Sequence, residues 1–171
     1  MDAEIRRILC ATDLSGNCDH IYNGAMNLAD ERNAGLLVIH VISHRSIKAA
    51  KTLAYFLNES PKDVVKEKTY SALQLMEERL GSFFKKEIQH HPEYPGIVEH
   101  MLVYPGNIAD TIVEKAEYFG CEAIVLGSHN TRFLTRFFSG GTAKKVLEQT
   151  KKPVFMVSMK HGKIDITSSN K

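Results

Sequence analysis

The chain has 171 residues, of which 43% are hydrophobic and 25% are charged, and its formal net charge is +2. This length suits one domain with a substantial core but is short for two, and the composition is that of an ordinary globular protein. The small net charge, without Lys/Arg clusters interleaved with aromatic residues, argues against nucleic-acid binding. No stretch of about 18 apolar residues occurs, so the sequence predicts no membrane contact through a spanning helix.

The N-terminal segment and the cysteines both bear on the compartment. Residues 1–7 lack the apolar core of a secretory signal peptide. The three cysteines, Cys10, Cys18 and Cys121, are odd in number and show no Cys-x-x-Cys spacing. We interpret them as free thiols in a reducing compartment and expect a cytoplasmic protein. A redox sensor is the alternative, which no motif supports.

Apolar runs alternate with amphipathic segments along the chain, and the two patterns predict strands and helices. Strands are expected at 5–11, 36–41, 97–104, 122–126 and 153–157. Helices are expected at about 17–33, 63–89, 108–119 and 142–150, with an unclear segment at 43–62 that can hold a short helix around 49–57. The domain is expected to cover residues 1–158, followed by a frayed polar tail over 159–171.

Runs that are apolar on both faces, such as Leu36–Val41, are typical of central strands in a parallel sheet covered by helices. The regular alternation of strands and helices therefore predicts a doubly wound α/β domain. Ligands of such domains bind beyond the carboxyl ends of the strands, where the strand order reverses. If the first strand borders the fourth, residues 11–13, 41–43 and 127–141 meet at that edge and form one binding cleft.

The segment Leu126-Gly127-Ser128-His129-Asn130, followed later by Gly140-Gly141-Thr142-Ala143, is the most informative part of the chain. A glycine turn after a buried strand exposes backbone N–H groups, and the N-terminus of a helix adds favourable partial positive charge. Together these features suggest a phosphate-binding loop.

Four separated motifs resemble the universal stress protein family. They are Ile8–Ser15, His40-Val41, Gly106–Ile112, and Ala123–His129 with Val146-Leu147 and Pro153-Val154 after it. The motifs stand in the family's order and spacing, and the resemblance covers residues 5–157. It implies a five-stranded parallel sheet with strand order 3-2-1-4-5 and helices on both faces, usually a homodimer, and a role in stress response. Some members bind ATP and others do not.

The ATP-binding members carry the signature Gly-x-x-Gly-x9-Gly-Ser/Thr. Gly127 and Gly140 match its first and third glycines, whereas Asn130 replaces the second. Gly141 stands at the hydroxyl position, and Thr142 supplies a hydroxyl one residue later. Asn tolerates positive φ better than other side chains, at a cost of about 1 kcal/mol. Loss of a charge-assisted hydroxyl donor costs about 1.5–3 kcal/mol.

The resemblance also implies roles for single residues. Asp13 would hold the ribose, Ala11 and Val41 would border the adenine, and the loops at Gly127 and Gly140 would take the phosphates of ATP, with Mg²⁺. The candidate nucleotide-binding residues are Ala11, Asp13, Val41, Leu126, Gly127, His129, Asn130, Gly140, Gly141 and Thr142. Asp13 can alternatively cap the first helix, and His129 can be a solvated loop residue.

Other motifs give little support to a metal site or to catalysis. His90-His91 lacks a Cys or carboxylate at ligand spacing, so no metal site is expected. His40 is interpreted as a satisfied core or cleft residue. The sequence contains no Gly-Lys-Ser/Thr loop, Gly-x-Ser-x-Gly elbow or His-Glu-x-x-His motif. Because Asp13 has no convincing general base beside it, a slow ATP hydrolase is the least supported function.

Two functions stay open, both of them non-catalytic. The first is a regulator that binds an adenine nucleotide, and the second is a dimeric adaptor of the same fold that binds no nucleotide and acts through an unknown protein partner. The regulator requires that nucleotide binding tolerates Asn130 and Gly141 in place of the signature residues. The adaptor has no such requirement. The homodimer follows from the resemblance and is supported by the apolar last strand, whose outer edge can pair with another edge.

Overall fold

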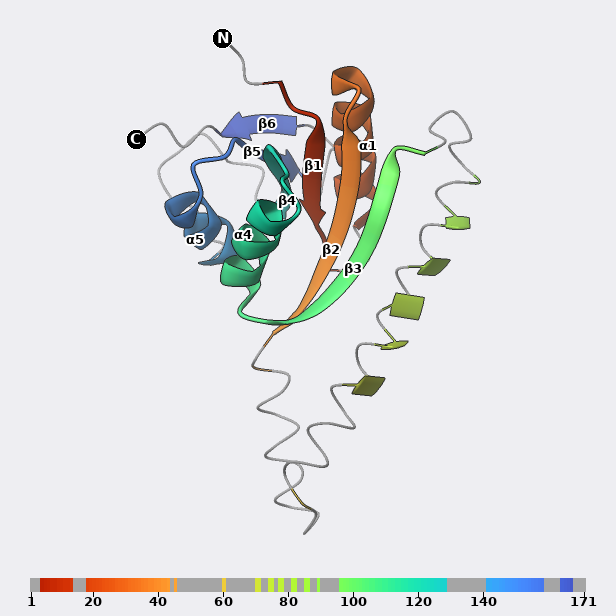
Figure 1. Cartoon of the computed structure of the whole chain (residues 1–171), viewed down its shortest axis with the longest axis vertical. Coiled ribbons are helices and arrows are strands. Elements are labelled where there is room, and N and C mark those ends of the chain that lie inside the picture. Colours follow the sequence, from red (N-terminus) through yellow and green to blue (C-terminus); the bar gives the residue numbers. More distant parts are fainter. Residues whose placement is uncertain are drawn as a thin grey trace.

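The computed structural model describes residues 4–13, 18–43, 96–128, 141–158 and 164–167, together with single positions between 45 and 89. These residues form a sheet and the helices around it (Figure 1). The elements in chain order are β1 (Arg7–Ala11), α1 (Cys18–Arg32), β2 (Gly35–Ser43), β3 (Val98–Gly106), α4 (Ile108–Tyr118), β4 (Ala123–Ser128), α5 (Gly141–Gln149), β5 (Val154–Ser158) and β6 (Ile164–Thr167).

The sheet has the order β3-β2-β1-β4-β5-β6. Strands β1 to β5 are parallel to one another, which confirms the doubly wound fold and the order 3-2-1-4-5. Helix α1 covers one face, whereas α4 and α5 cover the other (Figure 1). Among the described residues, no helix combines the length and apolarity that crossing a membrane requires.

The central strands build two cores because successive residues of a strand face opposite sides of the sheet. Leu9 of β1 and Ile124 of β4 lie in the core under α4 and α5, whereas Cys10 and Val125 lie in the core under α1. All four side chains are buried. This burial on both faces is why these strands are continuous apolar runs in the sequence.

Local backbone chemistry sets the ends of the helices. The side chain of Asn107 caps α4 by accepting a hydrogen bond from the backbone N–H of Asp110 at 3.4 Å. After α4, Gly120 adopts φ 63° and its N–H donates to the carbonyl of Glu117 at 3.0 Å. This left-handed conformation ends a helix at low cost when the residue is glycine. The chain is thereby turned directly into β4.

The tail beyond Ser158 corrects the expectation of a frayed segment over 159–171. Residues Ile164–Thr167 form β6, which pairs antiparallel with β5. The sequence Ile-Asp-Ile-Thr is short and flanked by polar residues, so its pattern alone gave no strand signal. It alternates β-branched and polar residues, however, and the outer edge of β5 offers N–H and C=O groups that need partners.

The expected helix over 63–89 is described at scattered positions, which are helical at Tyr70, Leu75 and Gln89 among others. The expected short helix at 49–57 lies outside the described residues. The described strands β1 to β5 and the helices α1, α4 and α5 begin and end within two residues of the expected bounds.

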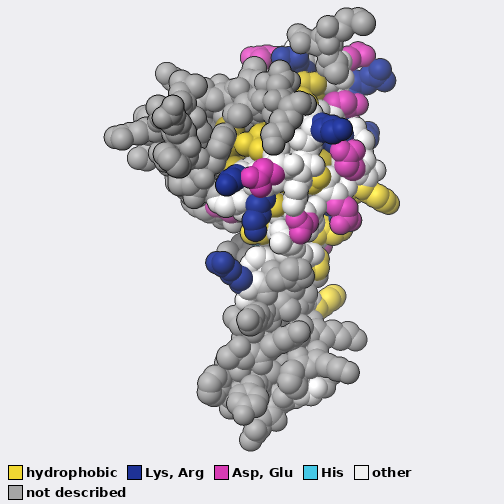
Figure 2. Space-filling model, turned by 90° about the vertical axis from the view of Figure 1, so that its left-hand side faces the viewer, with side chains coloured by type: hydrophobic (Ala, Val, Ile, Leu, Met, Phe, Trp, Pro, Cys, Tyr) yellow, Lys and Arg dark blue, Asp and Glu magenta, His cyan; other side chains and the backbone are white. Residues whose placement is uncertain are grey.

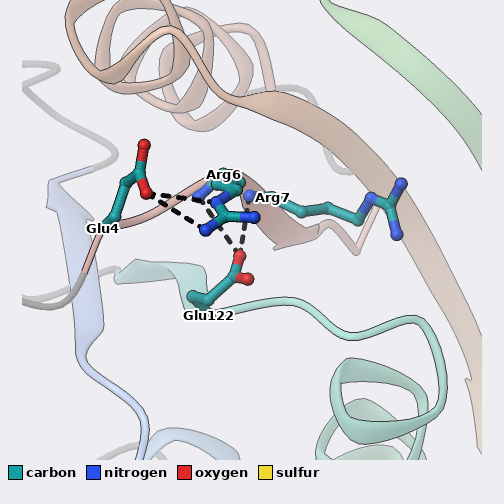
Figure 3. Close-up of polar contacts among 4 residues, drawn as sticks. All are labelled: Glu4, Arg6, Arg7 and Glu122. Atoms are coloured by element: carbon teal, nitrogen blue, oxygen red, sulfur yellow. Dashed lines mark hydrogen bonds and ion pairs between the residues drawn. The ribbon is translucent and has the colours of Figure 1, made fainter.

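Glu122 joins the amino ends of β1 and β4 (Figure 3). Its Oε2 atom accepts hydrogen bonds from the backbone N–H of Arg7 at 2.8 Å and of Arg6 at 3.2 Å. The Arg7 guanidinium donates to the carbonyl of Phe119 at 2.8 Å, so β1 is also tied to the end of α4. Glu4, in contrast, pairs with the exposed side chain of Arg6.

We expect Glu122→Ala to lower the free energy of unfolding by about 1–3 kcal/mol, because it leaves two backbone N–H groups without their acceptor. Glu4→Ala is the matched control, and it should change stability by less than about 0.5 kcal/mol because its ion pair is exposed. Urea unfolding followed by circular dichroism measures both. Equal stability losses in the two variants would contradict this account of the β1–β4 junction.

Candidate functional site

The carboxyl ends of β1 and β4 lie at the same edge of the sheet, and β2 runs on past the end of β1 (Figure 1). Ala11, the last residue of β1, is opposite Ile39 of β2 on one side and Leu126 of β4 on the other. The chain leaves β1 toward β2 and later returns to place β4 on the opposite side of β1, so the strand order reverses here. This edge is therefore the position at which doubly wound domains bind ligands.

Two hydrogen bonds fix the turn that follows β1. The backbone N–H of Thr12 donates to the carbonyl of Ile39 at 2.9 Å. The Nδ1 atom of His40 lies 2.9 Å from the carbonyl oxygen of Thr12. Because a carbonyl oxygen only accepts, Nδ1 is the donor. The turn thus delivers Asp13 to an exposed position at the carboxyl edge. His40 is half-buried and hydrogen-bonded, in agreement with its interpretation as a satisfied cleft residue.

The candidate residues at this edge run from buried to exposed. Val41 and Leu126 are only 8% and 4% exposed, so each offers a ligand little side-chain surface. Ala11 and Gly127 are half-buried, and Asp13 is exposed. Buried apolar residues therefore lie beside the exposed Asp13 at this edge. A flat apolar ring could rest on these apolar residues while its polar substituents contact Asp13.

Helix α5 supplies the next two candidates, Gly141 and Thr142. Gly141 is exposed and is the first described residue of α5, and the first turn of this helix contains no acidic residue. A Cβ atom added at Gly141 would meet no atom within 4 Å in the part of the chain that the structure describes. These described surroundings therefore accept a serine at this position.

Some of the expected site residues lie together in the structure, and others lie outside the described residues. Ala11, Asp13, Val41, Leu126 and Gly127 lie at the carboxyl ends of β1, β2 and β4, as the sequence predicted. Gly141 and Thr142 enter from α5, whose connection to β4 runs through residues 129–140. Three candidates, His129, Asn130 and Gly140, lie in that connection and outside the described residues. For the whole set, ligand binding stays a prediction.

Sequence reasoning missed two features of this edge. The first is the contact of His40 with the backbone before Asp13. The second is Ser158, which ends β5 opposite Ser128 of β4. Its side chain is 6% exposed, and its Oγ atom has no hydrogen-bond partner in the described part of the chain. A serine closing an otherwise apolar strand was the available signal.

Charges and thiols at the described surface favour neither a metal nor a redox centre. Basic and acidic side chains are mixed on the face shown in Figure 2. Within the described ranges, no three His, Cys, Asp or Glu side chains gather to hold a metal ion.

Cys121 lies near the amino ends of the strands, away from the candidate site. Burial raises the pKa of its thiol to about 11, so the thiol is neutral and unreactive at pH 7.

Comparisons with known proteins agree with the fold. A model of the universal stress protein family matches residues 4–158. Universal stress protein A homolog 1 of Coxiella burnetii is 26% identical over 155 residues, which are 91% of this chain and 97% of that protein. Universal stress protein MJ0577 of Methanocaldococcus jannaschii is 24% identical over 166 residues, 94% of this chain and 99% of that protein.

Solved structures share the same arrangement of elements. The structure of MJ0577 aligns with a TM-score of 0.61 at 22% identity and covers 91% of this chain and 97% of its own. A universal stress protein solved in complex with cAMP aligns with a TM-score of 0.52 at 15% identity, covering 92% and 99%. At these identities the likeness establishes the fold.

Proposed function

Because the chain belongs to the universal stress protein family, we propose that it is a non-catalytic stress-response regulator that binds an adenine nucleotide at the carboxyl edge of its sheet. The observation that carries the proposal is the register of β1 between β2 and β4, which sets Ala11 beside Leu126. Asp13 follows on one side and Gly127 on the other. Asp13 and Gly127 therefore lie where the strand order of the sheet reverses, which is the usual place for a ligand.

The shape of the edge favours a nucleotide over a simple anion. The half-buried Ala11 and the visible parts of Val41 and Leu126 would border the adenine, and Asp13 would accept hydrogen bonds from the ribose hydroxyls. Gly127 and the N-terminus of α5 would meet the phosphates through backbone N–H groups. The cAMP complex of a protein with this fold supports adenine as the base.

ATP with Mg²⁺ is the ligand we favour, because Gly127 and Gly140 match two glycines of the ATP signature in the sequence. The Mg²⁺ ion would arrive with those phosphates. We do not propose that the protein hydrolyses the bound ATP, because hydrolysis requires a positioned metal and an activated water. Cys10 and Cys121 are buried and are not in a disulfide, which suits a reducing compartment, so a cytoplasmic location is part of the proposal.

A dimeric adaptor that binds no nucleotide is the second candidate. It is favoured by the small exposed surface of Val41 and Leu126 and by the two departures from the ATP signature, Asn130 and Gly141. In that case the edge would be a remnant of the family's site, and the protein would act through protein contacts. Dimerisation in either form would need a surface other than the outer edge of β5 as it stands, because β6 pairs with that edge.

Nucleotide binding is expected to stabilise the protein. ATP at about 100 times its Kd adds about 2.7 kcal/mol, which raises the Tm of a chain of this size by about 5–10 °C. Melting curves with millimolar ATP and Mg²⁺ measure this shift, with GTP as the control ligand. An equal shift with GTP would contradict the adenine assignment, and no shift with any adenine nucleotide would favour the adaptor.

A further inference from the structure

The chain leaves β1 at a point where its neighbour β2 continues. Strand β1 ends at Ala11, opposite Ile39, whereas β2 runs on to Ser43 beside β3. Thr12, the first residue after β1, is still tied to β2, because its backbone N–H donates to the carbonyl of Ile39 at 2.9 Å. The path of the turn that leads to Asp13 is therefore set by contacts with β2.

The side chain of His40 makes the second contact of this turn. Its Nδ1 atom lies 2.9 Å from the carbonyl oxygen of Thr12 and donates to it. Thr12 is thus held at both its N–H and its C=O group, so the peptide units before and after it have fixed orientations. A peptide unit is planar, and the second of these units ends at the nitrogen of Asp13. His40 therefore helps to set the point from which the Asp13 side chain starts.

His40 acts from the side of the sheet opposite to Val41. Successive residues of a strand face opposite sides, and Val41 belongs to the core under α4 and α5, whereas Val38 belongs to the core under α1. The half-buried His40, two residues after Val38, therefore faces the side of α1. Its ring lies away from the surface of Val41 that we propose to border adenine. Any effect of His40 on a ligand would then pass through Thr12 and Asp13.

A carboxylate in a fixed position suits a ribose better than a phosphate. Asp13 is exposed at the carboxyl edge. A carboxylate accepts hydrogen bonds through two oxygens and repels other anions, whereas the 2′ and 3′ hydroxyls of a ribose are adjacent donors. The two groups match when the carboxylate keeps one orientation. Holding the backbone before Asp13 also reduces the ordering that a ligand must bring about when it binds.

We propose that His40 is a positioning residue. By holding the turn that carries Asp13, it makes the site select nucleotides whose ribose has free 2′ and 3′ hydroxyls. The inference rests on the proposed adenine-nucleotide site, and it adds a residue that does not touch the ligand and a class of ligand, the ribonucleotides with an intact cis-diol. A nucleotide without these hydroxyls gains nothing from the held turn.

The first measurement uses the unchanged protein and two ligands, ATP and 2′,3′-dideoxy-ATP, each with Mg²⁺. The ligands differ only in the two ribose hydroxyls. Calorimetric titration should give a Kd for dideoxy-ATP about 10-fold to 150-fold higher than the Kd for ATP, the range for hydrogen bonds to a charged group. Equal Kd values overturn this inference and leave the nucleotide site standing. No binding of either ligand overturns both.

The second measurement compares variants of His40. His40→Leu removes the donor, and His40→Asn keeps an N–H donor at the equivalent δ position. His40→Leu should raise the Kd for ATP about fivefold, the equivalent of one ordinary hydrogen bond, and leave the Kd for dideoxy-ATP unchanged. His40→Asn should bind ATP nearly as well as the unchanged protein. His100→Leu, at an exposed position near the amino end of β3, is the matched control and should alter neither Kd.

The variant that combines His40→Leu with Asp13→Ala completes the test. Because His40 acts through Asp13, this variant should bind ATP no more weakly than Asp13→Ala alone. Melting curves without ligand check that each variant is folded, and His40→Phe replaces His40→Leu if the latter does not fold. The inference is overturned if His40→Leu weakens ATP and dideoxy-ATP equally, if it changes neither, or if the losses in the combined variant are additive.

Discussion

The double substitution of Asn130 by Gly and of Gly141 by Ser should strengthen ATP binding by two to three orders of magnitude. Glycine at 130 relieves about 1 kcal/mol of backbone cost, and a serine hydroxyl at 141 adds a phosphate donor worth about 1.5–3 kcal/mol. The added Cβ atom at 141 meets no atom of the described residues within 4 Å, so they leave room for it. Calorimetric titration with ATP and Mg²⁺ measures the change in Kd.

Gly141→Ala is the control for this gain. It introduces the same Cβ atom into the same open space but carries no hydroxyl, so it should leave the affinity close to that of the unchanged protein. An equal gain from alanine and from serine would show that helix propensity at the start of α5 is the cause. No gain from the double variant would count against the proposed phosphate position.

Asp13→Ala is expected to weaken ATP binding by about 10-fold to 150-fold, because a carboxylate that accepts hydrogen bonds from the ribose contributes about 1.5–3 kcal/mol. The turn before Asp13 is held by His40 and by the backbone of Ile39, so its position should survive the substitution. Calorimetry gives the affinity, and a melting curve without ligand gives the stability.

Asp13→Asn separates the two roles considered for this residue. Asparagine caps helices about as well as aspartate, so a capping role predicts unchanged stability and unchanged affinity. A ribose contact predicts weaker binding at unchanged stability, since the amide loses the charge and one acceptor oxygen. Asp30→Asn, an exposed position near the end of α1, is the control and should alter neither quantity.

Strands β1, β2, β4 and β5 were predictable because they are buried on both faces and so appear as continuous apolar runs, whereas the more exposed β3 was predicted from alternating apolar and polar residues. Leu36–Val41 is the clearest case, and it lies within β2. Strand β6 was not predictable in the same way. Its four residues carry too weak a pattern alone, and they form a strand because the edge of β5 is there to receive them. That edge exists only once the sheet is assembled.

The general position of the candidate site followed from the rule that ligands bind at the carboxyl ends of parallel strands. Ala11, Val41 and Gly127 stand at such ends because each closes or follows an apolar run. The contact between His40 and Thr12 could not be predicted, and neither could the lack of a hydrogen-bond partner for Ser158 Oγ among the described residues. Both depend on how neighbouring strands are aligned, and a single strand's sequence does not specify that alignment.

Calorimetric titration of the purified, nucleotide-free protein with ATP and Mg²⁺ tests the central claim most directly. The proposed edge predicts one ATP per chain with a Kd in the micromolar range, about −8 kcal/mol of binding free energy. The same titration of Asp13→Ala should then show the expected loss. No binding heat at millimolar ATP, together with an unchanged melting curve, would contradict the claim and make the adaptor the better description.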